Sequence, residues 1–174
     1  TPSSWAKRLP IAVYRGAWFI EALSHMGNTR PRLATIKGFM LAADELIAVP
    51  DDLSDALVAS SLLRGLTADV LLHRVARVSQ GSRILVQAAG GGMGQILSQW
   101  ATQLGAMVIG TAGSDTTAKK AEQAGCVEVI RYRGTDAQDV AARVQQLTGG
   151  EGVDVAYDGV GKDSFDASLA SLGI

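Results

Sequence analysis

Residues 83–94 read RILVQAAGGGMG, and this stretch decides the fold. The apolar run Arg83–Ala88 is typical of a buried strand, and a turn of small residues follows it. Apolar side chains then recur at spacings of three and four, which predicts a helix over Gly92–Leu104 that Gly105 ends. A strand that turns through glycines into an amphipathic helix begins a βαβ unit.

Three further strand–helix pairs follow this first one. Right-handed crossovers then predict a parallel sheet with strand order 3-2-1-4. The fold class is therefore α/β: a Rossmann-type, doubly wound parallel sheet of four strands, in which the last two strands of a full dinucleotide domain are missing. The further strands are expected at Met107–Thr111, Val127–Tyr132 and Val153–Asp158; the helices are expected at Asp115–Ala124, around Val140, Val144 and Leu147 after a capping box of Thr135 and Gln138, and after Ser164 with Phe165, Leu169 and Leu172 in register.

The predicted domains are an N-terminal segment, 1–50, and an NAD(P)-binding Rossmann domain, 51–174, that is C-terminally incomplete. Ser54 is expected to cap a helix that reaches Gly65, and a second helical run covers Leu66–Val75. The stretch Ile11–Met26 fits one helix or two short strands equally well.

The composition and charge of the chain argue against several classes of function. The net charge of −1 gives no general reason to bind nucleic acid, and the longest apolar runs are shorter than the roughly 20 residues of a membrane span. Residues 1–40 hold six Lys or Arg and one acid, which we interpret as a solvated surface rather than an RNA or lipid site. Cys126 is the only cysteine and is expected to be buried in a cytoplasmic protein. His25 and His73 are expected to lack nearby carboxylate or cysteine partners, so no metal site is predicted.

The small residues after the first strand fit a dinucleotide fingerprint. Ala89, Gly91 and Gly94 occupy its three small-residue positions. The first permits a tight turn, the second lets backbone amides approach a pyrophosphate, and the third lets helix and strand pack closely. The sequence therefore predicts a phosphate group at the N-terminus of this helix.

The end of the second strand bears on the choice of cofactor. NAD-preferring domains place a carboxylate there, whereas this chain has Ala112. NADPH is therefore favoured, with NADH possible, and Ser114 with the Gly113 backbone could hold a 2′-phosphate, helped by Lys119, Lys120 or Arg133. The alternative is that Asp115 caps the next helix and the lysines are solvated. Asp158, at the end of the fourth strand, has either a cofactor role or, as we favour, a turn or capping role.

Several longer blocks carry a resemblance to a known family. They include LRGLTA (63–68), VQAAGGGMG (86–94), VIRYR (129–133) and YDGVGKDSF (157–165). From about Met40 to Leu172 the chain resembles the quinone oxidoreductase (zeta-crystallin-like) branch of the medium-chain dehydrogenases/reductases. Residues 1–39 do not match, although Met40–Pro50 is similar to the closing stretch of the family's N-terminal catalytic domain, of which this chain would keep only a remnant.

The resemblance implies a zinc-independent oxidoreductase that passes a hydride from NADPH to a quinone or enone. It implies a homo-oligomer for the full-length enzyme and little turnover by this chain alone, and it assigns no catalytic residue here. The lysine that the family usually has beside the 2′-phosphate is replaced by Thr117 in this chain. Two alternatives stay open, an enoyl reductase and a non-catalytic nucleotide- or RNA-binding module. By resemblance, Thr67 lies near the nicotinamide, Gly91, Gly92 and Met93 hold the pyrophosphate, Gly113, Ser114 and Tyr132 hold the 2′-phosphate, and Gly159 and Val160 border the nicotinamide ribose.

Overall fold

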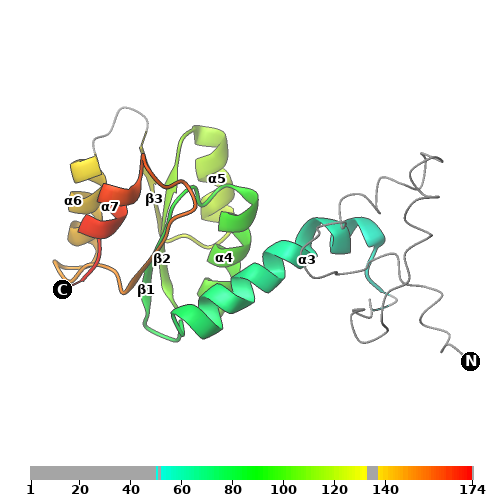
Figure 1. Cartoon of the computed structure of the whole chain (residues 1–174). Coiled ribbons are helices and arrows are strands. Elements are labelled where there is room, and N and C mark those ends of the chain that lie inside the picture. Colours follow the sequence, from blue (N-terminus) through cyan, green and yellow to red (C-terminus); the bar gives the residue numbers. More distant parts are fainter. Residues whose placement is uncertain (1–49, 51, 133–136, 174) are drawn as a thin grey trace, which may run out of the picture. The chain divides into compact units, whose positions relative to one another are not determined.

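A four-stranded parallel sheet forms the centre of the C-terminal part of the chain (Figure 1). The computed structural model describes residues 50, 52–132 and 137–173. The strand order β3-β2-β1-β4 confirms the predicted 3-2-1-4 topology. Because all strand pairs are parallel, the carboxyl ends of the four strands lie at one edge of the sheet. The strands are β1 (Arg83–Val86), β2 (Met107–Ala112), β3 (Glu128–Arg131) and β4 (Val155–Tyr157).

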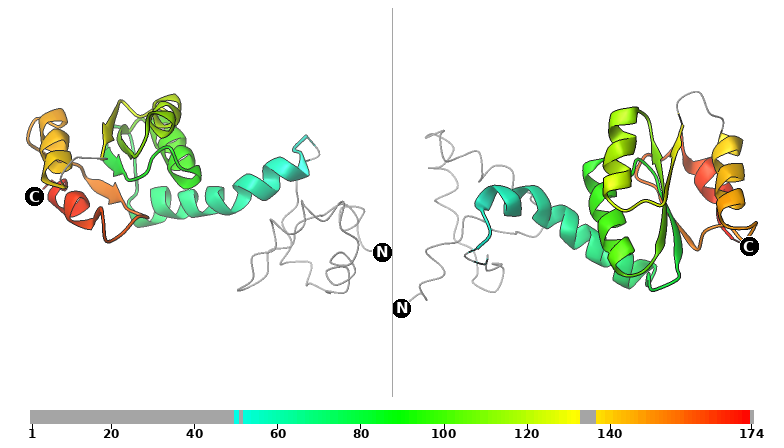
Figure 2. Two further views of the ribbon diagram at one scale, coloured as in Figure 1. Left: turned by 90° about the horizontal axis from the view of Figure 1, so that it is seen from above. Right: turned by 180° about the vertical axis from the view of Figure 1, so that it is seen from behind.

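Helices cover both faces of the sheet, which makes it doubly wound (Figure 2). One face packs against α4 and α5, and the other against α6 and α7. Glycines with positive φ follow three of these helices, at Gly105, Gly125 and Gly149. This is the conformation in which glycine commonly ends a helix. The helices are α3 (Asp55–Asp69), the π-helix η3 (Val70–Val75), α4 (Gly92–Gln103), α5 (Asp115–Gln123), α6 (Ala137–Leu147) and α7 (Phe165–Ala170).

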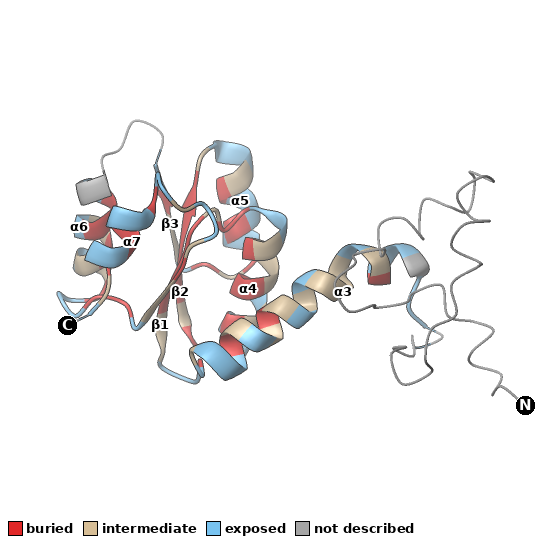
Figure 3. Cartoon of the chain, in the orientation of Figure 1, coloured by how far each residue is buried: buried red, intermediate tan, exposed pale blue. Residues whose placement is uncertain are grey.

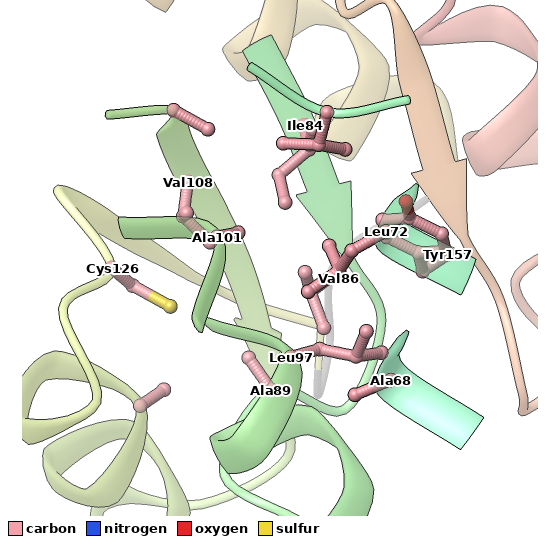
Figure 4. Close-up of a cluster of buried hydrophobic side chains, with 13 residues drawn as sticks. Ala68, Leu72, Ile84, Val86, Ala89, Leu97, Ala101, Val108, Cys126 and Tyr157 are labelled. Atoms are coloured by element: carbon pink, nitrogen blue, oxygen red, sulfur yellow. The ribbon is translucent and has the colours of Figure 1, made fainter. Parts of the chain in front are cut away.

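Alternate residues of each central strand serve the two faces. Ile84 and Val86 point toward α4 and belong to the cluster in Figure 4, whereas Leu85 packs with the α6 and α7 side. Figure 3 shows the central strands almost entirely buried. Each fully buried side chain of this size contributes roughly 1.5–3 kcal/mol by removal from water. The core, rather than local propensity, therefore fixes the sheet.

The strands end differently from the sequence prediction. The first strand stops at Val86 and not at Ala88, because Ala88 adopts a left-handed conformation with φ 50° that turns the chain. The third and fourth strands are also shorter than predicted, and the second extends one residue further, to Ala112. Val153 makes only an isolated bridge with Leu172. These shifts leave the topology unchanged.

The predicted pair of helices before the sheet is continuous. Ser54 caps α3 as expected, with its Oγ accepting from the Leu57 amide at 3.3 Å, but the helix does not break at Gly65. A Cβ at Gly65 would meet nothing within 4 Å, and a helix interior tolerates a glycine at a cost of about 1 kcal/mol. The α-helix passes directly into η3, where the Ala76 amide bonds the Leu71 carbonyl five residues back at 3.2 Å.

Contacts divide the chain into two units, Thr1–Gly65 and Leu66–Ile174. The predicted boundary at residue 50 stays a prediction, and the expectations for 11–26 and for His25 lie outside the described residues. The helical stretch Ala56–Val75 is long and apolar enough to cross a membrane by length and composition. In the second unit, its residues Ala68 and Leu72 are fully buried in the hydrophobic cluster beside the sheet (Figure 4).

The buried face of α7 differs from the prediction. Phe165 and Leu169, expected on the inner face, are 59% and 58% exposed. Ala167, Ser168 and Ser171 face inward instead. Polar partners beneath the helix fix this rotation, because they hydrogen-bond the Ser168 hydroxyl.

Candidate functional site

The turn between β1 and α4 presents backbone amides at the carboxyl edge of the sheet. Gly91 is the N-cap of α4, and the first turn of this helix contains no acidic residue. The first amides of a helix have no intrahelical acceptor, and its dipole makes this end positive. The Gln95 side chain donates from Nε2 to the Gly90 carbonyl at 3.0 Å, and this hydrogen bond stabilises the turn. The turn can therefore receive an anion such as a pyrophosphate.

Close backbone packing explains the small residues of this turn. A Cβ on Gly94 would lie 2.6 Å from the Ala88 carbonyl oxygen and from Ala89 Cα, as the third fingerprint position requires. A Cβ on Gly91 would lie 3.1 Å from the same oxygen. Ala89 is completely buried. Gly92 and Met93, which follow in the first turn, are exposed and partly buried, respectively.

Gly90 was not singled out from the sequence, yet it has the tightest surroundings. A Cβ there would lie 2.1 Å from the carbonyl oxygen of Thr117 in α5. This contact joins the β1–α4 turn to the start of the neighbouring helix. No local pattern could have revealed it, because Thr117 is distant in sequence.

A second group of residues lies where β2 ends. Ser114 is the N-cap of α5, and its Oγ accepts from the Thr117 amide at 3.3 Å while Thr117 Oγ1 accepts from the Ser114 amide at 3.1 Å. The alternative that Asp115 is the cap is therefore wrong, because Ser114 occupies that position with a complete capping box. Tyr132 reaches over from the end of β3, and a Cβ on Gly113 would lie 2.6 Å from its hydroxyl oxygen.

The loop after β4 is organised by the carboxylate of Asp158. Its Oδ1 accepts the amides of Val160 and Gly161, both at 2.9 Å. The Ser164 hydroxyl donates to the same oxygen at 2.7 Å, and the Ser168 hydroxyl donates to Oδ2 at 2.8 Å. Burial alone would raise the pKa of Asp158, but these four donors outweigh burial and lower it. Asp158 thus has a turn role, one of the two structural roles that we favoured, and Gly159 and Val160 are exposed in this turn.

A buried polar chain beneath these loops was not predicted. Gln87 donates from Nε2 to Ser168 Oγ at 2.9 Å and accepts from Thr111 Oγ1 at 2.7 Å. Thr111 Oγ1 also accepts the Ala88 amide at 3.0 Å. The Ser168 hydroxyl continues to Asp158. The chain therefore connects the ends of β1, β2 and β4, and each partner is too far along the sequence for a motif to show it.

Thr67 lies on α3, partly buried, one turn before Leu71. The Leu71 carbonyl accepts the Tyr157 hydroxyl at 3.0 Å, which ties the helix to the strand that leads into the 158–164 loop. Thr67 thus lies one helical turn before the residue of η3 that contacts β4. Its role stays a prediction.

The remaining candidate residues have structural surroundings. Cys126 is buried beside Ser98 Oγ at 3.5 Å, and burial raises the pKa of its thiol, as expected for an inert cysteine. Trp100 packs against the core and meets the His73 ring edge-on at 5.3 Å. The expectation that His73 lacks a carboxylate neighbour is wrong, because Asp69 Oδ1 lies 3.9 Å from its Nε2 one helical turn away. Among residues 50, 52–132 and 137–173, no cluster of three or more metal-binding side chains occurs. Arg133 and Thr135 lie outside the described residues.

Parts of the chain are similar to known dehydrogenases and reductases. Residues 92–174 match the family described as zinc-binding dehydrogenase. A 2-haloacrylate reductase from a Burkholderia species is 46% identical over 132 residues, which are 75% of this chain and 39% of that protein. The chain spans about two-fifths of the length of the curated relatives it matches.

Similar proteins are also found among solved structures. A mycobacterial protein complexed with NADPH is 48% identical with a TM-score of 0.73, over 77% of this chain and 40% of that one. The Escherichia coli quinone oxidoreductase complexed with NADPH is 40% identical with a TM-score of 0.70, over 75% of this chain and 39% of that one.

Proposed function

We propose that this chain belongs to the quinone oxidoreductase branch of the medium-chain dehydrogenases/reductases, and that it is the NADPH-binding part of an enzyme that reduces quinones or similar conjugated acceptors. The observation that carries the proposal is the turn at residues 88–94, where closely packed glycines lead into the first amides of α4 and the first turn of this helix holds no acidic residue. Ala112, at the end of β2, places no carboxylate where a 2′-phosphate would lie.

The residues of the site fit a dinucleotide that stretches along the carboxyl edge of the sheet. Ala89, Gly91, Gly92, Met93 and Gly94 supply the pyrophosphate turn. In the proposal, Gly113, Ser114 and Tyr132 hold the adenosine end. Thr67, Gly159 and Val160 border the nicotinamide end.

When bound, NADPH supplies the hydride, so the protein needs to position and shield the reacting groups rather than act as an acid or base. This fits a site built largely from backbone amides and small side chains. The helix N-terminus holds the negative pyrophosphate without adding a charged side chain. The Asp158-organised loop fixes Gly159 and Val160 beside the ribose position, and the buried polar chain keeps that loop in register with the pyrophosphate turn.

The acceptor is a quinone or another conjugated carbonyl compound in this proposal. The 2-haloacrylate reductase among the relatives extends the acceptor class to activated alkenes, which accept a hydride in the same way. We propose a soluble, cytoplasmic protein whose full-length form is a homo-oligomer, which works without zinc and does not act on nucleic acid. Turnover is proposed for a protein that carries this domain together with an acceptor-binding part.

Gly92→Asp tests the pyrophosphate site, because it separates binding from stability. Gly92 is exposed in the first turn of α4, and an aspartate there stabilises a helix through the dipole by about 0.3–1 kcal/mol while it repels a phosphate. We expect a Tm equal to or above that of the unsubstituted chain and at least a roughly tenfold weaker affinity for NADPH, measured by calorimetric titration.

The matched control is Gln99→Asp, which adds the same charge to the exposed middle of α4. It should leave NADPH affinity within about twofold of the original value, because the dipole effect is confined to the first turn. Equal NADPH affinity for Gly92→Asp and the unsubstituted chain would reject this site. Absence of NADPH binding by the unsubstituted chain would reject the function itself.

A further inference from the structure

We propose that Arg131 is the residue that selects NADPH over NADH, by holding a cation beside the first turn of α5. This inference rests on the proposed function, since it assigns the 2′-phosphate of the cofactor to that place. It differs from the expectation from sequence, which assigned the help to Lys119, Lys120 or Arg133.

The sheet register brings Arg131 to the right position. Arg131 is the last residue of β3 and pairs with Ala112, the last residue of β2. The next residue, Tyr132, donates its amide to the Ala112 carbonyl at 3.2 Å. Arg131 therefore stands beside the position at which a carboxylate would bind the ribose in an NAD-specific domain, and an arginine near this point accommodates a 2′-phosphate.

The side chain of Arg131 points to the start of α5. Its Nη1 forms an ion pair with Asp115 Oδ1 in the first turn of that helix. The two side chains are 58% and 76% exposed, so the guanidinium stays accessible to a ligand. A guanidinium presents five donors in a planar fork, which matches the oxygens of a phosphate.

Two features of this corner make a cation necessary. The capping box engages the Ser114 and Thr117 amides with side-chain oxygens, so these two amides are not available to a phosphate. Asp115 adds a negative charge that would repel a phosphate at the same helix end. Arg131 neutralises that carboxylate and supplies donors. Lys120 is less suited, because it lies in the last turn of α5.

The test measures the ratio of NADPH to NADH affinity for the 174-residue chain by calorimetric titration. For Arg131→Ala we expect NADPH affinity to fall about tenfold, the effect of one charge-assisted hydrogen bond, and NADH affinity to change by less than about twofold. Arg131→Lys should restore part of the ratio, because it returns the charge without the fork of donors. Asp115→Asn should raise NADPH affinity and leave NADH unchanged.

Arg143→Ala is the matched control. Arg143 is a partly exposed arginine that pairs with Glu128 at 3.0 Å, at the opposite end of β3. It should leave the ratio of the two affinities unchanged. A second titration with adenosine 2′,5′-bisphosphate and with AMP should reproduce the Arg131→Ala effect for the bisphosphate alone.

The outcomes separate this inference from the function on which it rests. If the unsubstituted chain binds NADPH but Arg131→Ala lowers both affinities equally, or neither, Arg131 does not select the cofactor and the proposed function stands. An equal loss of the ratio in Arg143→Ala would also overturn the inference, because the effect would then be one of overall charge. If neither dinucleotide binds the unsubstituted chain, both proposals fail together.

Discussion

Replacement of Gln87 by leucine should destabilise the domain, although leucine is similar in size and more apolar. The Gln87 side chain is 8% exposed and makes two buried hydrogen bonds, one to Ser168 Oγ and one from Thr111 Oγ1. Each such bond contributes about 0.5–1.5 kcal/mol, and the loss of one member also leaves its partners without an acceptor or donor. We therefore expect Gln87→Leu to lower the free energy of unfolding by about 1–3 kcal/mol.

A double-mutant cycle with Thr111→Val tests this reasoning. The valine retains the shape and strand preference of threonine but removes the hydroxyl that bonds both Gln87 and the Ala88 amide. Because the two single variants each lose the same Gln87–Thr111 bond, the double variant should cost less than their sum by roughly 1 kcal/mol.

Equilibrium urea unfolding followed by circular dichroism gives the three free energies. Gln123→Leu, at an exposed position at the end of α5, is the control and should change stability by less than about 0.5 kcal/mol. Strict additivity of the two substitutions, within about 0.3 kcal/mol, would show that the hydroxyl and the amide do not interact. An increase in stability in Gln87→Leu would refute the account of the polar chain as a whole.

Other expected outcomes follow from the same structure. The lowered pKa of Asp158 means that its contribution to stability is present at neutral pH and is lost as the pH falls below about 4 toward the folded-state value; urea unfolding from neutral to acidic pH should show this loss, and Asp158→Asn should reduce it. The raised pKa of the buried Cys126 thiol predicts slow reaction with a soluble disulfide reagent in the folded chain and fast reaction in urea; a rapid reaction without denaturant would contradict it. Leu85→Ala should cost about 2–5 kcal/mol by urea unfolding, because Leu85 is completely buried between β1 and the α6–α7 layer, whereas Leu57→Ala at an exposed position of α3 should cost far less.

Features of the fold could be predicted from the sequence where a local pattern of residues has a single physical explanation. The small residue at Gly94 is required by the packing of α4 on β1, and the structure shows the backbone atoms that a Cβ would meet. The strand order followed from the handedness of crossovers alone. Gly105, which ends α4, has the positive φ that its position predicted.

The sequence was insufficient where a residue depends on a partner far along the chain. Gly90 is constrained by the Thr117 carbonyl, and Gln87 by Ser168, and neither partner belongs to a motif. The predicted buried face of α7 was wrong for the same reason. Apolar periodicity predicted that Phe165 faces inward, whereas the hydrogen-bonded hydroxyl of Ser168 determines which face is buried. Between Ser114 and Asp115, both of which suit an N-cap, only the geometry identifies the serine.

The two ends of the proposed cofactor site have different physical supports, and this makes their contributions separable. The pyrophosphate turn and the Asp158 loop share one buried chain through Gln87 and Ser168, so a change in that chain should weaken contacts at both places. Arg131 at the end of β3 and Asp115 at the start of α5 form an exposed ion pair. Substitutions in the buried chain should therefore lower NADPH and NADH affinity together and be largely independent of salt, whereas Arg131 should alter only NADPH affinity and lose its effect as ionic strength rises.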